Sequence, residues 1–203
     1  METQAVEIEI KFHLPNPETT RADILSLGAT SMGRLFERNV CFENKEKTFK
    51  IRDILLRLRQ DDKSRLTFKS PPDNRDDQFK VYNELEVEVS DFDTCFAILK
   101  RLGFVPEKTY EKWRETFALD QTKLLIDTTP VGTFLEIEGD KSKILTLARR
   151  LGFDWRNRIL LNYLEIFDII NKQEHLGLTD MTFDRFHSVD VDLSNHLPDL
   201  FVS

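Results

Sequence analysis

The sequence predicts an α+β fold in which antiparallel strands close into one barrel and helices pack on its outside. Three observations favour this fold. Several segments alternate apolar with charged residues, helical stretches that end at glycine separate them, and the order of these elements occurs twice along the chain. Two similar halves that pack edge to edge would close their strands into a barrel and leave no strand edge exposed.

Length, composition and charge limit the function classes. The chain has 203 residues, of which 40% are hydrophobic and 32% charged, as in a soluble globular protein. Residues 1–12 carry acids where a signal peptide would be basic and then apolar, so we expect a cytoplasmic protein with no membrane partner. The net charge of −7 disfavours a nucleic-acid partner. The seven glycines form neither GxGxxG nor GxxxxGK[ST], which excludes the usual dinucleotide and P-loop sites.

The first half of the repeat begins with an acidic strand. Residues 6–12 alternate, so their charged side chains share one face and their apolar side chains share the other. That charged face bears Glu7, Glu9 and Lys11. A helix over residues 18–27 is expected to end at Gly28, because glycine favours the left-handed position after a helix. Strands over residues 56–59 and 65–69 then carry basic faces. Their basic residues are Arg57, Arg59, Arg65 and Lys69.

The second half repeats this order. An acidic strand over residues 84–89 is followed by a helix over residues 92–102, and residues 112–114 form the next basic strand. An acidic hairpin turns at Pro130 and Gly132. The charged residues of this half are Glu84, Glu86, Glu88, Lys112, Arg114, Asp127, Glu136 and Glu138.

Two further helices are expected at residues 142–151 and 157–174, the second with an apolar stripe. Residues 178–203 show no clear periodicity of apolar residues. We therefore expect one domain over residues 1–177 and an acidic tail or peripheral extension over residues 178–203.

The charged faces point to an enclosed site for a charged ligand. If helices cover the apolar faces, the charged faces must line the lumen, and buried ion pairs barely repay their desolvation. Acid pairs two residues apart on a strand suit Mg²⁺ or Mn²⁺, whereas arginine suits phosphate oxygens. The alternative is an open sheet whose charged face is in water. We favour the enclosed site because acids and bases segregate by sign along the chain.

The same residues resemble the signature of the CYTH superfamily, the triphosphate tunnel metalloenzymes. Residues 6–11 resemble the ExExK motif of that family, and the likeness continues in order to about residue 170. It implies an eight-stranded antiparallel barrel, a triphosphate tunnel, that binds a triphosphate-containing small molecule such as ATP or polyphosphate. Within the family, the segments after residue 133 look most like the class IV adenylyl cyclase branch.

The resemblance also implies a role for each charged residue. The metal ligands would be Glu7, Glu9, Glu136 and Glu138. The triphosphate-binding bases would be Lys11, Arg57, Arg59, Lys69, Lys112 and Arg114. Lys11, Glu84, Glu86 and Asp127 would be catalytic or would support the metal ligands.

Three functions remain open from the sequence. The first is a metal-dependent cyclase that converts ATP to cyclic AMP and pyrophosphate. The second is hydrolysis of tripolyphosphate, thiamine triphosphate or a nucleoside triphosphate, and the third is a polyphosphate-binding module without activity. A full set of acids and bases favours an enzyme over a binding module. A homodimer is expected only because it is common among small enzymes.

Overall fold

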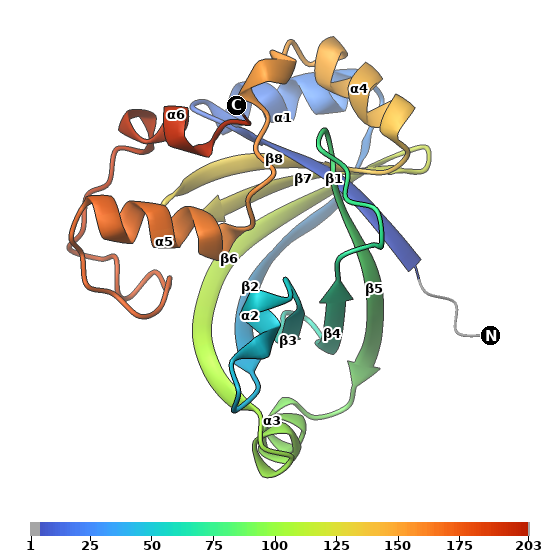
Figure 1. Ribbon diagram of the computed structural model, residues 1–203. Coiled ribbons are helices and arrows are strands. Elements are labelled where there is room, and N and C mark those ends of the chain that lie inside the picture. The colour runs from blue at the N-terminus through green and yellow to red at the C-terminus, as the bar shows by residue number, and fades with distance from the viewer. Residues whose placement is uncertain (1–4, 203) are drawn as a thin grey trace.

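Eight strands form a closed barrel in the computed structural model, which describes residues 5–202 (Figure 1). The strands are β1 (Ala5–His13), β2 (Thr30–Glu43), β3 (Leu55–Gln60), β4 (Ser64–Ser70), β5 (Lys80–Val89), β6 (Val105–Leu119), β7 (Thr122–Thr129) and β8 (Gly132–Glu138). Around the barrel they follow the order β1-β5-β4-β3-β2-β6-β7-β8, and every neighbouring pair is antiparallel. The predicted fold class is confirmed.

Helices pack on the outside of the barrel. They are α1 (Pro17–Ser26), α2 (Thr48–Ile51), α3 (Phe92–Arg101), α4 (Lys141–Arg150), α5 (Tyr163–Gln173) and α6 (Leu197–Leu200). No helix among the described residues has the length and apolar character needed to span a bilayer.

Strand register directs the charged residues to the lumen. Side chains directly opposite each other on paired strands lie on the same face. Lys11 of β1 is opposite Glu136 of β8, and Arg114 of β6 is opposite Asp127 of β7. Because apolar residues alternate with these positions, the outer surface of the barrel is apolar where helices pack on it.

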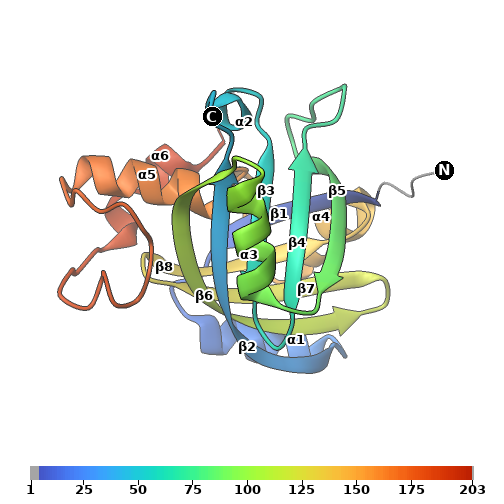
Figure 2. The ribbon, with the colours of Figure 1, turned by 90° about the horizontal axis from the view of Figure 1, so that it is seen from below.

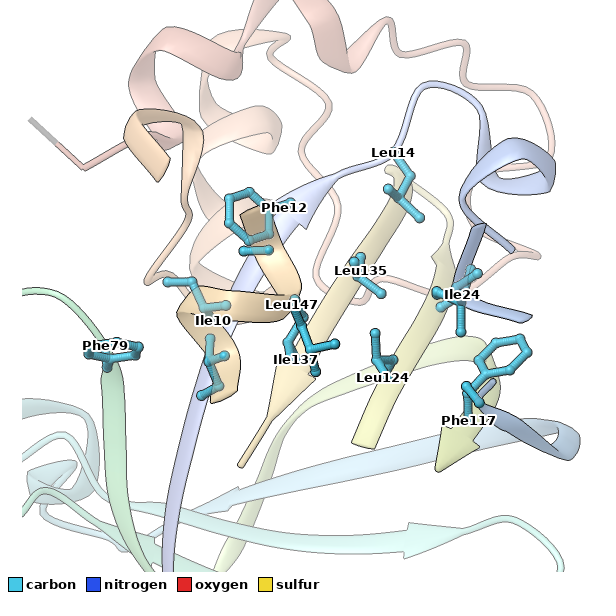
Figure 3. Close-up of a cluster of buried hydrophobic side chains, with 14 residues drawn as sticks. Ile10, Phe12, Leu14, Ile24, Phe79, Phe117, Leu124, Leu135, Ile137 and Leu147 are labelled. Carbon is cyan, nitrogen blue, oxygen red and sulfur yellow. The ribbon is translucent and has the colours of Figure 1, made fainter. Parts of the chain in front are cut away.

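The largest apolar layer lies outside β1, β7 and β8, under α1 and α4 (Figure 3). Ile10 and Ile137 from the strands pack with Ile24 of α1 and with Ile144 and Leu147 of α4. Helix α1 begins at Pro17, and Asn16 is its N-cap. The side chain of Asn16 accepts a hydrogen bond from the backbone N–H of Thr19, 3.2 Å away. This layer fixes β1 and β8, the two strands that carry the predicted metal ligands.

A second apolar layer lies on the opposite wall, where α3 packs across the outside of the barrel (Figure 2). Phe92 and Leu99 of α3 contact Val40 of β2 and Leu58 of β3. The carboxylate of Asp91 caps the helix by accepting a hydrogen bond from the backbone N–H of Thr94. The alternation places Arg57 and Arg59, the neighbours of Leu58, in the lumen.

The predicted helix over residues 157–174 was wrong at its start, since α5 begins at Tyr163. The preceding residues are extended, and the backbone N–H of Ile159 donates to the carbonyl of Lys11, 2.8 Å away. Asn162 and Glu165 form a capping box that fixes the first turn. This local cap and the pairing to β1 outweigh the helical spacing of the apolar residues before it.

The C-terminal segment, residues 178–202, packs on α5 and along one edge of β6. The backbone of Met181 pairs with β6 on both sides of Tyr110, and Phe186, Leu193 and Leu200 are buried in the cluster that contains α5. The division at residue 177 into a domain and an extension stays a prediction, and residues 1–4 and 203 of those predicted ranges lie outside the described residues.

Candidate functional site in the barrel lumen

A cavity of about 540 Å³ occupies the lumen. All eight strands contribute charged residues to its lining, and residues of α2 and α5 also line it. The predicted site residues that line it are Glu7, Glu9, Lys11, Arg57, Arg59, Lys69, Glu84, Glu86, Lys112, Arg114, Glu136 and Glu138. The closed barrel therefore brings to one cavity every predicted site residue except Asp127, which is on the inner face opposite Arg114 but is fully buried and does not line the cavity.

Three carboxylates from β1 and β8 converge in this cavity. Each of Glu7, Glu9 and Glu138 offers an oxygen atom, and these oxygens lie within 4.8 Å of one another. Burial, with a further contribution from the charges of Glu7 and Glu9, raises the pKa of Glu138 to about 7 against the opposing charge of Arg114. Carboxylates this close repel one another, and a divalent cation with oxygen ligands would relieve that repulsion. The donor set fits Mg²⁺ or Mn²⁺.

Glu136 lies apart from that cluster. Its carboxylate is 2.9 Å from the ammonium group of Lys11 and also accepts a hydrogen bond from Arg114. Burial alone would raise the pKa of Glu136, but the charges of Lys11 and Arg114 hold it well below the usual range. The structure thus gathers three of the four predicted metal ligands and pairs the fourth with two predicted triphosphate-binding bases.

Basic side chains line the wall formed by β3 and β4. The guanidinium of Arg57 donates to the hydroxyl oxygen of Tyr110 at 3.2 Å and to that of Thr67 at 3.3 Å. Arg59 donates to a carboxylate oxygen of Glu86 at 3.2 Å. Lys69 of β4 pairs with Glu7 and with Glu84. These neighbours hold long, flexible side chains in place before any ligand binds.

Asp127 is the centre of a buried hydrogen-bond network. Its side chain is fully buried and accepts hydrogen bonds from the ammonium of Lys112 and from Nε of Arg114, each at 2.7 Å. The hydroxyl of Tyr163 from α5 donates to it at 2.8 Å. Asp127 therefore orients two bases of the cavity.

Sequence reasoning missed several polar residues that line the cavity. They include Glu37, Lys80, Tyr82, Tyr110 and Tyr163. The ammonium group of Lys80 lies 2.9 Å from the carboxylate of Glu9, one of the candidate metal ligands. A signal for two of these residues was present, because the alternation of the acidic strand extends back through Tyr82 and Lys80 with Val81 between them.

The acid cluster makes a test of metal binding possible without an activity assay. Glu138→Gln is expected to stabilise the metal-free protein at pH 8 by about 3 kcal/mol, because a group with a pKa of about 7 carries an unfavourable charge there. The gain should fall as the pH drops from 7 towards 4.5, where the folded wild-type protein takes up the proton. Urea unfolding in EDTA at pH 8 and pH 5 measures both values.

In a separate thermal-unfolding experiment without EDTA, Mn²⁺ should raise the unfolding midpoint of the wild type and not of Glu138→Gln. Glu115→Gln is the matched control, since Glu115 also lies on a barrel strand but pairs with Arg21 and does not line the cavity. A Glu138→Gln variant that is less stable than the wild type in EDTA, or that keeps the full response to Mn²⁺, would contradict the assignment.

Comparisons with known proteins agree with this geometry. The CYTH domain family matches residues 5–151. A curated protein of Methanocaldococcus jannaschii, "Putative adenylate cyclase MJ0240", is 27% identical over 173 residues, which cover 79% of this chain and 98% of that protein. The solved structure of the PH1012 protein from Pyrococcus horikoshii is 32% identical with a TM-score of 0.67, over 78% of this chain and 98% of that one.

A more distant structure shows the same fold. HpAC1 from Hippeastrum, an adenylyl cyclase by name that is described as having a dominant triphosphatase activity, is 18% identical with a TM-score of 0.59. The match covers 80% of this chain and 95% of that one.

Proposed function

Because this chain belongs to the CYTH domain family, we propose that it is a metal-dependent enzyme that acts on a triphosphate, with ATP as substrate and cyclic AMP and pyrophosphate as products. The observation that carries the proposal is one cavity that holds a cluster of three carboxylates together with the six predicted triphosphate-binding bases. Such a cavity suits a polyphosphate and a divalent cation together. The relative named as an adenylate cyclase supports the choice of reaction.

In this proposal Glu7, Glu9 and Glu138 hold Mg²⁺ or Mn²⁺, and the six bases hold the triphosphate oxygens. When bound, the cation would polarise phosphoryl oxygens and lower the pKa of the attacking hydroxyl. The bases are Lys11, Arg57, Arg59, Lys69, Lys112 and Arg114. They neutralise the charge that develops on the phosphates during transfer, which is most of what this reaction asks of a protein.

The predicted supporting acids act through these bases. Glu84 orients Lys69, and Glu86 orients Arg59. Asp127 orients Lys112 and Arg114 from outside the cavity, so we assign it a positioning role. Glu136, predicted as a metal ligand, directs Lys11 towards the lumen in the metal-free protein.

The second candidate function is hydrolysis of a triphosphate, with water as the nucleophile. The same acids and bases serve both reactions, because the difference lies in which phosphorus faces the nucleophile. The triphosphatase activity described for HpAC1, a protein with this fold, makes hydrolysis the alternative to test.

One product analysis separates the candidates. The protein is incubated with ATP, tripolyphosphate or thiamine triphosphate in the presence of Mg²⁺ or Mn²⁺, and the products are separated by anion-exchange chromatography. Cyclic AMP with pyrophosphate from ATP supports the cyclase, whereas orthophosphate supports the triphosphatase. No product from any of the three, from a folded protein with either cation, would contradict both.

A further inference from the structure

Glu37 of β2 is a buried acid within the basic part of the cavity. Its side chain lines the lumen and is only 3% exposed. It is directly opposite Lys112 of β6, so the two side chains share the inner face of the barrel. An acid in this place is unexpected in a site for a polyanion, because its charge repels the ligand.

Three bases surround the carboxylate of Glu37. The nearest atoms are Nη1 of Arg59 and Nζ of Lys112, each at 3.6 Å, and Nε of Arg114 at 3.8 Å. All three distances are too long for a hydrogen bond. Burial would raise the pKa of Glu37, but the charges of Lys112, Arg114 and Arg59 together lower it to about 2. Glu37 is thus a charged counter-ion shared by three bases.

Arg59, Lys112 and Arg114 donate their hydrogen bonds to acids other than Glu37. Lys112 and Arg114 donate to Asp127 on the β7 side, and Arg59 donates to Glu86 on the β5 side. In the part of the chain that the structure describes, Glu37 is the one acid within ion-pair distance of bases from both β3 and β6. It therefore connects two groups of bases that would otherwise repel each other across β2.

Buried polar atoms beside Glu37 also lack hydrogen-bond partners among the described residues. They are Oε2 of Glu37, both side-chain polar atoms of Asn39, and Nε of Arg57 and of Arg59. Asn39 is fully buried and lies opposite Arg59. Native proteins satisfy nearly all such atoms, and those left over need a reason. An arrangement set by charge rather than by direct hydrogen bonds leaves the N–H donors of Asn39, Arg57 and Arg59 free for a ligand.

We propose that Glu37 is a positioning residue, whose charge holds Arg59, Lys112 and Arg114 in one array for the transferring phosphates at the expense of affinity for the bound triphosphate. This inference rests on the proposed function. It requires that loss of the charge has opposite effects on binding and on turnover. A residue with a merely structural role would weaken both and lower the stability of the fold.

The test compares Glu37→Gln with the wild type in two assays. Calorimetry with inorganic tripolyphosphate in EDTA measures affinity without metal or turnover, and steady-state kinetics with the substrate and cation used by the wild type measures kcat and KM. We expect Glu37→Gln to bind tripolyphosphate about tenfold more tightly and to lose at least about tenfold in kcat. An unchanged or weaker affinity, or an unchanged kcat, would overturn the proposal.

Two controls keep the result interpretable. Glu37→Asp keeps the charge but draws it back from the bases, so its affinity should match the wild type while kcat falls. An unchanged kcat in this variant would overturn the inference even if Glu37→Gln fails to fold. Glu115→Gln should change neither value, since Glu115 pairs with Arg21 away from the cavity. If the wild type turns over no triphosphate, the proposed function fails, and the calorimetry still tests the effect of Glu37 on affinity.

Discussion

Asp127→Ala is expected to lower the free energy of unfolding by about 3–5 kcal/mol, enough to unfold much of the protein at 37 °C. Asp127 is fully buried and is the shared acceptor for Lys112, Arg114 and Tyr163. Lys112 is itself only 2% exposed, so the substitution leaves a buried ammonium group beside a guanidinium with too little opposing charge. Removal of one partner from a buried ionic network costs more than the net contribution of the intact network.

Urea unfolding followed by circular dichroism measures this loss. Glu88→Gln is the comparison, because Glu88 pairs with the exposed Lys63 and its side chain is 57% exposed. Its effect should stay within about 1 kcal/mol, as is usual for surface ion pairs. A similarly small loss for Asp127→Ala would mean that Lys112 and Arg114 do not depend on Asp127 for their charge balance.

Glu9→Gln is expected to lower kcat at least about a thousandfold, because it removes the charge of a central metal ligand while keeping the shape of the side chain. Glu9 belongs to the acid cluster with Glu7 and Glu138 and lies directly opposite Glu138 on the paired strand. Burial would raise its pKa, but the charges of Lys80 and Lys11 help lower it to about 2, so the carboxylate is ionised at neutral pH. The glutamine can still accept a hydrogen bond from Lys80 but provides a much weaker ligand for Mg²⁺.

The control for Glu9→Gln is Glu115→Gln, which should keep wild-type kcat because Glu115 is outside the cavity. Circular dichroism and gel filtration establish that both variants are folded before the rates are compared. Turnover of Glu9→Gln within tenfold of the wild type, with the same requirement for Mn²⁺, would show that the cation binds elsewhere.

Most of the barrel could be predicted because its strands have a strict alternation. Each of β1, β3, β4, β5 and β8 has apolar residues on one face and charges on the other, and that pattern fixes which face is inside. The long strand β2 was missed. Its outward positions include Arg34 and Arg38 as well as Phe36, which obscures the period. The start of α5 was missed because the backbone of Ile159 pairs with β1, a contact that local spacing cannot reveal.

The sequence predicted which residues make up much of the candidate site, but not how those residues pair with one another. Residue type and order were enough to name twelve of the acids and bases that line the cavity, but not Glu37 or Lys80. The sequence could not separate Glu136 from the acid cluster, because Glu136 and Glu138 share a face and only the pairing of Glu136 with Lys11 and Arg114 distinguishes them. Glu37 was missed with its strand. The roles of these residues, the cytoplasmic location and a homodimer stay predictions.

A crystal structure with Mn²⁺ and tripolyphosphate bound tests the proposed site most directly. We expect an anomalous peak for Mn²⁺ between the carboxylates of Glu7, Glu9 and Glu138, and phosphates in the lumen against Arg57 and Arg114. Mn²⁺ bound away from those carboxylates, or tripolyphosphate bound only on the outer surface of the barrel, would contradict the proposed site.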